Sequence, residues 1–139
     1  IKHDKERYEH KYEYCDLLIA GSGPSGLASA YAAAQNGARV ILAEDKSRFG
    51  GSLLTSEVTI GNQSGQEWAE KIISELKSMP NVVVKNRSQV FGYYDHNMLV
   101  MSERVSDHLP QTDKYIPKQR CNASKRCPKT LWFGYFRRN

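Results

Sequence analysis

The sequence lacks several features that would assign it to a special class of protein. Its apolar runs stop far short of the roughly 18 residues that span a bilayer, so we expect no membrane segment. Three cysteines are an odd number for a disulfide framework, which favours reduced thiols in a cytoplasmic protein. The charged opening IKHDKERYEHKYEY does not resemble a secretory signal peptide. A chain of 139 residues then predicts one globular core.

Acidic residues are absent from the last part of the chain. All 15 Asp and Glu residues precede Lys114, although Lys and Arg continue to the end, and the net charge is +5. A basic patch could contact nucleic acid, but a basic tail is more often solvated, so we expect no nucleic-acid partner. We interpret residues 114–139 as a basic tail, off-frame or disordered, and residues 1–14 as a charged linker or wrapping arm.

Catalytic and metal-binding patterns are also scarce. Cys121 and Cys127 have no nearby histidine and no second cysteine pair, so the sequence predicts no zinc site. His96 follows Asp95, but neighbours along a strand point to opposite faces, and we interpret His96 as a turn residue. Ser22 and Ser25 do not fit the five-residue spacing of a hydrolase elbow. We therefore expect no catalytic residue and no metal in this chain.

Apolar periodicity predicts an α/β fold. Two short apolar runs, at 17–20 and 39–44, read as buried strands of a parallel sheet, and residues 82–85 read as its third strand. Helical spacing of apolar residues predicts helices at 25–36 and 66–79.

A second pattern follows these elements. Residues 89–94 and 98–104 read as a hairpin that turns at His96-Asn97, which would form a small antiparallel flap. The predicted architecture is a Rossmann-like βαβ fold with a parallel core and this flap. The chain opens on Ile1 rather than Met, as a fragment would, and we expect a fold that is incomplete at both ends.

A glycine loop joins the first predicted strand to the first predicted helix. Gly21 permits the tight turn, Gly23 lets a pyrophosphate approach the backbone, and Gly26 allows close packing of helix on strand. Pro24 suits the first helical turn, whose free N–H groups and positive dipole end would face phosphates. This context predicts a dinucleotide-binding domain over residues 15–113.

Glu44 ends the second predicted strand, 18 residues after Gly26. Its carboxylate can accept hydrogen bonds from ribose hydroxyls and would repel a 2′-phosphate. This favours NAD, or the adenosine half of FAD, over NADP, although Lys46 and Arg48 weaken the exclusion. The alternative is a glycine turn in an ordinary βαβ unit that holds no ligand.

Several neighbours of Glu44 have two interpretations. Gly50-Gly51-Ser52 would cover the adenosine with backbone amides and a hydroxyl, or is a plain turn. Asp45 is a second ribose ligand or a solvated turn acid. Val90 places its backbone near the adenine or is simply a core residue.

These stretches resemble the alpha subunit of bacterial heterotetrameric sarcosine oxidase. The first 47 residues of the resemblance read YEHKYEYCDLLIAGSGPSGLASAYAAAQNGARVILAEDKSRFGGSLL, a pattern shared widely by two-dinucleotide-binding flavoproteins. VFGYYDHN followed by ERVSDHLP is more specific to the sarcosine oxidase subunit. The resemblance runs from about Tyr8 to Arg120. After Arg120 it departs from the family, which continues with an apolar strand and a glycine turn.

The resemblance implies an oxidoreductase that demethylates sarcosine, with oxygen as acceptor and tetrahydrofolate taking the one-carbon unit. It implies NAD as a bound ligand of this subunit, FAD and FMN on the beta subunit side, and gamma and delta subunits as further partners. The tetrahydrofolate site would belong to a part of the subunit outside this chain, so we expect no independent turnover. The implied NAD ligands are the glycine loop through Ser25, then Glu44, Asp45, Lys46, Ser52 and Val90.

Overall fold

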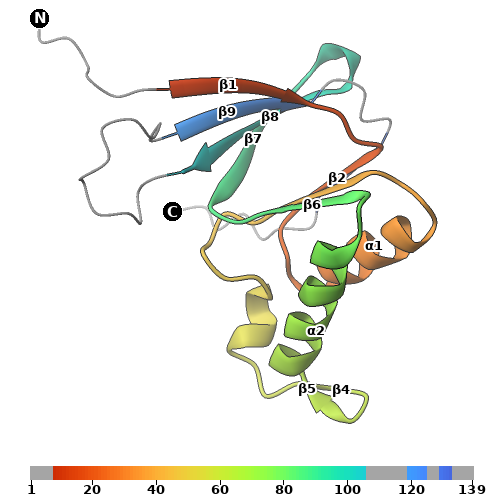
Figure 1. Ribbon diagram of the computed structural model, residues 1–139. Coiled ribbons are helices and arrows are strands. Elements are labelled where there is room, and N and C mark those ends of the chain that lie inside the picture. Colours follow the sequence, from red (N-terminus) through yellow and green to blue (C-terminus); the bar gives the residue numbers. More distant parts are fainter. Residues whose placement is uncertain (1–7, 106–118, 125–128, 133–139) are drawn as a thin grey trace, which may run out of the picture.

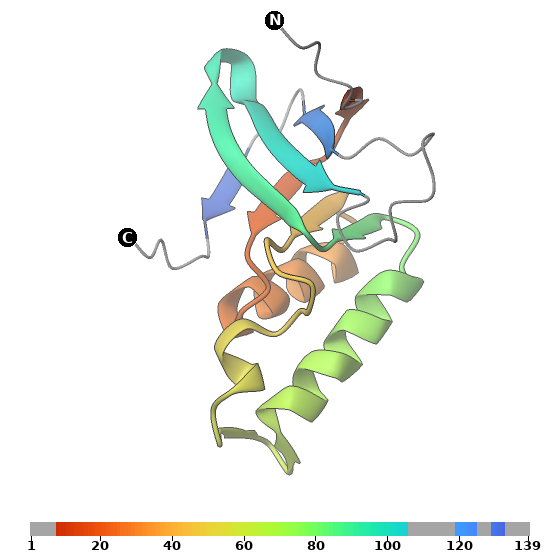
Figure 2. The ribbon, with the colours of Figure 1, turned by 90° about the vertical axis from the view of Figure 1, so that its left-hand side faces the viewer.

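The computed structural model describes residues 8–105, 119–124 and 129–132. Figure 1 shows three layers, in which two helices lie on one side of a parallel sheet and a second sheet lies on the other side. The view in Figure 2, turned by 90°, shows the same arrangement of helices below and hairpin above. This agrees with the predicted α/β class.

The parallel sheet contains the three predicted strands. They are β2 (Leu17–Ala20), β3 (Val40–Ala43) and β6 (Val82–Lys85). A fourth strand, β10 (Lys129–Trp132), pairs in parallel with β2, which gives the order β10-β2-β3-β6. Every residue of β3 is buried, because it is a central strand covered on both faces.

Two helices connect the parallel strands. The helix α1 (Pro24–Gln35) links β2 to β3, and Gly37 follows it with φ +83°, the left-handed conformation expected after a helix end. The helix α2 (Gly65–Ser78) begins with a capping box between Ser64 and Glu67. In the described part of the chain, no helix combines the length and apolar character needed to cross a bilayer.

Alternate residues of the parallel strands contribute to two hydrophobic cores, one on each face of the sheet. Ile19 and Leu42 point toward the helices, where they pack with Leu27 and Leu76. The intervening side chains Leu18, Ile41 and Ala43 point toward the other sheet and form the second core with side chains of that sheet: Val90, Leu99 and Met101. The period of two along each strand thus divides the apolar side chains between the faces.

The second sheet is mixed, with the order β1-β9-β8-β7. The predicted hairpin is present as β7 (Ser88–Tyr94) and β8 (Met98–Arg104), joined by the short helix η2 (Asp95–Asn97). His96 lies at this tip with φ 61°, so its interpretation as a turn residue is confirmed.

The two ends of the chain differ from the sequence expectation wherever the structure describes them. The strand β1 (Tyr8–Glu13) lies in the segment predicted to be a linker or arm, and it pairs in parallel with β9 (Gln119–Ser124). Both β9 and β10 lie in the segment predicted to be a disordered tail. Backbone pairing explains the difference, because strand hydrogen bonds do not require an apolar sequence. The division into an arm, a domain and a tail stays a prediction.

A short excursion separates β3 from α2. It contains the 3-10 helix η1 (Gly51–Leu54) and a two-stranded ribbon of β4 (Thr59–Ile60) and β5 (Gln63–Ser64). The side chain of Leu53 is buried in the helical core, which anchors η1 against α1 and α2.

Candidate dinucleotide-binding site

The glycine loop turns sharply between β2 and α1. Gly21 has φ +103°, a conformation that favours glycine, and its N–H donates to the Ala43 carbonyl at 2.7 Å. A Cβ on Gly26 would lie 2.1 Å from the Gly21 carbonyl oxygen. The loop therefore folds back on the first turn of α1 as closely as the sequence predicts.

The N-terminus of α1 is open toward the surface. Gly23 is the N-cap residue and provides no capping side chain, and Pro24 occupies the first turn. By helix geometry, the Ser25 and Gly26 N–H groups have no acceptor within the helix. A Cβ added to Gly23 would meet no atom of the described residues within 4 Å, so the described part of the chain leaves room beside this helix end. An anion can approach the backbone there.

Glu44 lies immediately after β3 and is only 4% exposed. Its Oε2 accepts from the Ser22 N–H at 2.9 Å and from the Ser22 hydroxyl, and its Oε1 accepts from the Lys46 N–H at 3.1 Å. Burial raises the pKa of Glu44 above its ordinary value of 4.5, and a hydrogen bond with Asp45 raises it further. The bonds from Ser22 and Lys46 lower the pKa without cancelling that rise.

A second loop closes against the glycine loop. The Gly50 N–H donates to the carbonyl oxygen and to the hydroxyl of Ser22, each at 3.1 Å. A Cβ on Gly51 would lie 2.9 Å from the Gly23 Cα, and Gly51 has φ +54°. The pair Gly50-Gly51 thus allows two backbones to touch beside the open helix end, while Ser52 remains exposed.

The structure brings most of the predicted site residues together. The glycine loop, Glu44 with its following residues, and Gly51-Ser52 converge at the carboxyl ends of β2 and β3. Asp45 and Lys46 are exposed at the rim. Val90 lies apart from them in the second core, with 7% of its surface exposed, and its contact with an adenine stays a prediction.

Sequence reasoning missed one member of this site. Ser22 is fully buried and contacts both Glu44 and Gly50, although the sequence offered it only as a poor match to a hydrolase elbow. Its partner Glu44 lies 22 positions away, so no local pattern reports the contact. The sequence feature that could have indicated this contact is a small hydroxyl residue between the first two glycines.

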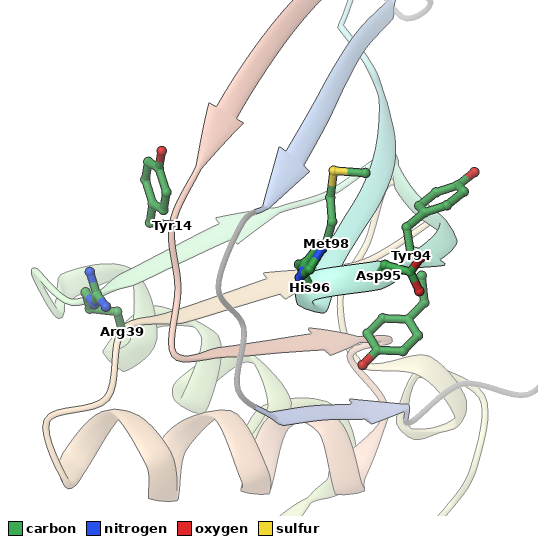
Figure 3. A pocket seen from close by; sticks show the side chains of 7 residues that line it. Tyr14, Arg39, Tyr94, Asp95, His96 and Met98 are labelled. Carbon is green, nitrogen blue, oxygen red and sulfur yellow. The ribbon is translucent and has the colours of Figure 1, made fainter.

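A separate cavity of about 1090 Å³ lies beside the hairpin tip. Figure 3 shows Tyr14 and Arg39 on one side of it and Tyr94, Asp95, His96 and Met98 on the other. The guanidinium of Arg39 is already engaged, with 2.7 Å between its Nη2 and Asp16 Oδ1. The lining residues of this cavity do not include the N-terminus of α1 or of α2, so the glycine loop is the better place for a dinucleotide.

Comparison with known proteins agrees with this geometry. Residues 16–112 match the family model of FAD dependent oxidoreductases. The chain is 43% identical to sarcosine oxidase subunit alpha of Rhizobium meliloti (strain 1021), a match that covers 84% of this chain and 12% of the relative. It is 35% identical to sarcosine oxidase subunit alpha of Corynebacterium sp. (strain P-1), covering 76% of this chain and 11% of that protein. The resemblance inferred from the sequence is confirmed.

A solved structure shares the fold at lower identity. L-proline dehydrogenase from P. horikoshii superposes with a TM-score of 0.65 at 18% identity, over 89% of this chain and 23% of that chain. The chain spans about a tenth of the length of the curated relatives that it matches.

Proposed function

The chain belongs to the FAD dependent oxidoreductase family, and we propose that it is the NAD-binding part of a sarcosine oxidase alpha subunit. In this proposal residues 15–113 are the dinucleotide-binding domain. The observation that carries it is the Glu44 carboxylate, held at the end of β3 beside an open helix N-terminus. Similarity to two sarcosine oxidase alpha subunits supports the choice of complex.

The adenosine ribose would bind Glu44. Three backbone or hydroxyl donors already fix this carboxylate, so a ribose hydroxyl would meet an acceptor that needs no rearrangement. Asp45 and Lys46 are exposed next to it and would contact the same ribose from the rim. Ser52 and the Val90 backbone would complete the adenosine side.

The pyrophosphate would lie at the N-terminus of α1. The open space beyond Gly23 is where a phosphate oxygen could approach the backbone, and the Ser25 and Gly26 N–H groups would donate to it. The positive end of the α1 dipole adds a favourable charge interaction there. Gly51 packs so closely on Gly23 that a Cβ on Gly51 would lie 2.9 Å from the Gly23 Cα, so this loop would lie beside the pyrophosphate.

The choice among dinucleotides depends on the ribose. A carboxylate at Glu44 disfavours a 2′-phosphate, which selects NAD or FAD against NADP. The matching family is described by FAD, so binding of the adenosine half of FAD is the second candidate. NAD is our first choice because the resemblance to the sarcosine oxidase subunit implies it.

The same proposal extends to the complex. The complete enzyme would demethylate sarcosine oxidatively, with oxygen as acceptor and the one-carbon unit passed to tetrahydrofolate. Beta, gamma and delta subunits would be its partners, with FAD and FMN associated with the beta subunit. This chain would contribute dinucleotide binding and have no turnover of its own.

Titration of the full chain tests the cofactor. Calorimetry with NAD, NADP and FAD should give a dissociation constant for NAD at least tenfold below that for NADP. Bound FAD is recognised independently by its visible absorption, which NAD lacks. Tighter binding of FAD than of NAD would support the second candidate, and equal binding of NAD and NADP would contradict the role of Glu44.

A further inference from the structure

Ser22 connects three parts of the candidate site. Its side chain has 0% exposure and lies between the glycine loop, Glu44 and the Gly50 turn. The hydroxyl donates to Glu44 Oε2 and accepts from the Gly50 N–H. A hydroxyl can perform both roles at once, since it has one proton and two lone pairs.

The hydrogen bonds to Glu44 are distributed unequally over its two oxygens. An ionised carboxylate offers about four acceptor positions, roughly two on each oxygen. Oε2 receives both donors of Ser22, whereas Oε1 receives one backbone donor, the Lys46 N–H. The acceptor position that no backbone or hydroxyl donor fills therefore lies on Oε1, and the exposed Asp45, which also hydrogen-bonds with this carboxyl, would share the ribose there.

We propose that Ser22 is a positioning residue that fixes Glu44 so that Oε1 accepts the ribose hydroxyl of the bound dinucleotide. This inference rests on the proposed function, because it concerns the same site. Ser22 contacts no ligand in this arrangement and acts through Glu44. The hydroxyl also ties the Gly50 turn to the carboxylate, so the covering loop and the ribose acceptor are set by one side chain.

The hydroxyl also stabilises the ionised form of Glu44. Its removal takes away a donor while leaving the burial unchanged, so the pKa of Glu44 should rise further. The charged groups near the carboxylate stay the same in such a variant. They are Asp45 and Lys46 beside it, Arg87 whose N–H donates to the Lys46 carbonyl, and Arg104 whose guanidinium donates to the Asp45 carbonyl.

The first test needs no ligand. The pKa of the Glu44 carboxyl is measured by carbon-detected NMR in the full chain, in Ser22→Ala and in the exposed control Ser56→Ala. We expect a higher Glu44 pKa in Ser22→Ala and no change in the control. An unchanged pKa in folded Ser22→Ala overturns the inference. Ser22→Cys, which is closer in size and a weaker donor, provides the same comparison if the alanine variant unfolds.

The second test is a double-mutant cycle with Glu44→Gln, read by NAD titration at pH 7. We expect Ser22→Ala to weaken NAD binding about tenfold, or 1.4 kcal/mol, when Glu44 is present. In the Glu44→Gln background the same change should have less than a twofold effect. Equal losses in both backgrounds overturn the inference while leaving NAD binding itself established. A parent chain that binds neither NAD nor FAD overturns the proposed function and the ribose contact together.

Discussion

Two carboxylates that are largely shielded from water have different kinds of partner in this molecule. Glu44, after β3, accepts from the N–H and hydroxyl of Ser22 and from the backbone of Lys46. Glu13, at the end of β1, faces two cations instead, with Lys11 Nζ at 3.0 Å and Lys85 Nζ at 3.2 Å from its Oε1.

The pKa values of Glu44 and Glu13 shift in opposite directions because their partners differ. Burial and a hydrogen bond with Asp45 raise the pKa of Glu44, and its neutral donors do not reverse that shift. Burial also raises the pKa of Glu13, but the hydrogen bond from Lys11 and the charge of Lys85 outweigh it, so the net shift is downward. Neutral donors orient a carboxylate and leave its charge uncompensated for a ligand, whereas cations neutralise it. The comparison separates the carboxylate of the proposed binding site from a carboxylate held by ion pairs.

Lys85 forms ion pairs that connect the two sheets. Its side chain is 9% exposed and its Nζ also lies 3.3 Å from Glu103 Oε2 on β8. This one cation joins the end of β6 in the parallel sheet to β1 and β8 in the mixed sheet. Replacing a cation in such a place leaves carboxylates with less compensation in a poorly solvated setting.

Lys85→Met should therefore give the largest effect. We expect a loss of about 3 kcal/mol in the free energy of unfolding at neutral pH. Chemical denaturation of the full chain measures it, with Lys71→Met on the exposed face of α2 as the control. A Lys85→Met chain as stable as the parent would show that the two carboxylates are compensated without this cation.

Gly23→Val tests the other region. Its backbone is extended, with φ −67°, and a Cβ there has 4 Å of clearance from the residues that the structure describes, so we expect the variant to fold. The added side chain would fill the phosphate space, and NAD binding should fall at least a hundredfold, about 2.8 kcal/mol. Calorimetric titration and a thermal melt measure the two properties. Retained binding in the folded variant would place the pyrophosphate elsewhere.

The sequence predicted the parallel layer well because its signals are local. The apolar run at Leu17–Ala20 coincides with β2, since a strand buried on both faces is apolar throughout. The predicted strand at Val82–Lys85 coincides with β6, which is the last strand in the described sheet order and leaves Val83 45% exposed. The fingerprint at Gly21 to Gly26 likewise reports a turn whose parts lie within six residues. Close packing of Gly26 on Gly21 confirms the predicted role of that glycine.

Contacts between distant segments left no such signal. The pairing of β1 with β9 joins Tyr8 to Gln119, and neither segment has a clear strand pattern in the sequence. Ser22 and Lys85 were missed as organising residues for the same reason, because their partners are distant in sequence. Periodicity identifies which segments are buried, while the pairing of polar groups depends on the assembled fold.

Glu44→Ala tests the proposed binding role of the other carboxylate. Loss of the ribose acceptor should weaken NAD binding by about 1–2 kcal/mol, the scale of a hydrogen bond to a charged group. Discrimination against NADP should fall at the same time, because the negative charge is gone. Titration with both cofactors checks this, and Glu57→Ala at an exposed position is the matched control. Unchanged NAD affinity would remove Glu44 from the site.

The smallest expected effect is the pH dependence that Glu13 adds to stability. Because its pKa in the folded chain lies below the ordinary value of 4.5, the folded state stabilises the ionised form. That contribution is fully present above pH 4.5 and is lost as the pH falls through the lowered pKa. Glu13→Gln should therefore be less stable than the parent by about 1 kcal/mol at pH 7, with the difference shrinking toward pH 3. Denaturation curves between pH 7 and pH 3 measure the difference.

Glu44→Gln is the contrasting variant. The raised pKa of Glu44 means that its ionisation opposes folding. Ionisation of Glu44 therefore makes the parent less stable as the pH rises from 4.5 through the raised pKa. If both variants showed the same trend with pH, the distinction between an acid held by cations and an acid held by neutral donors would not hold.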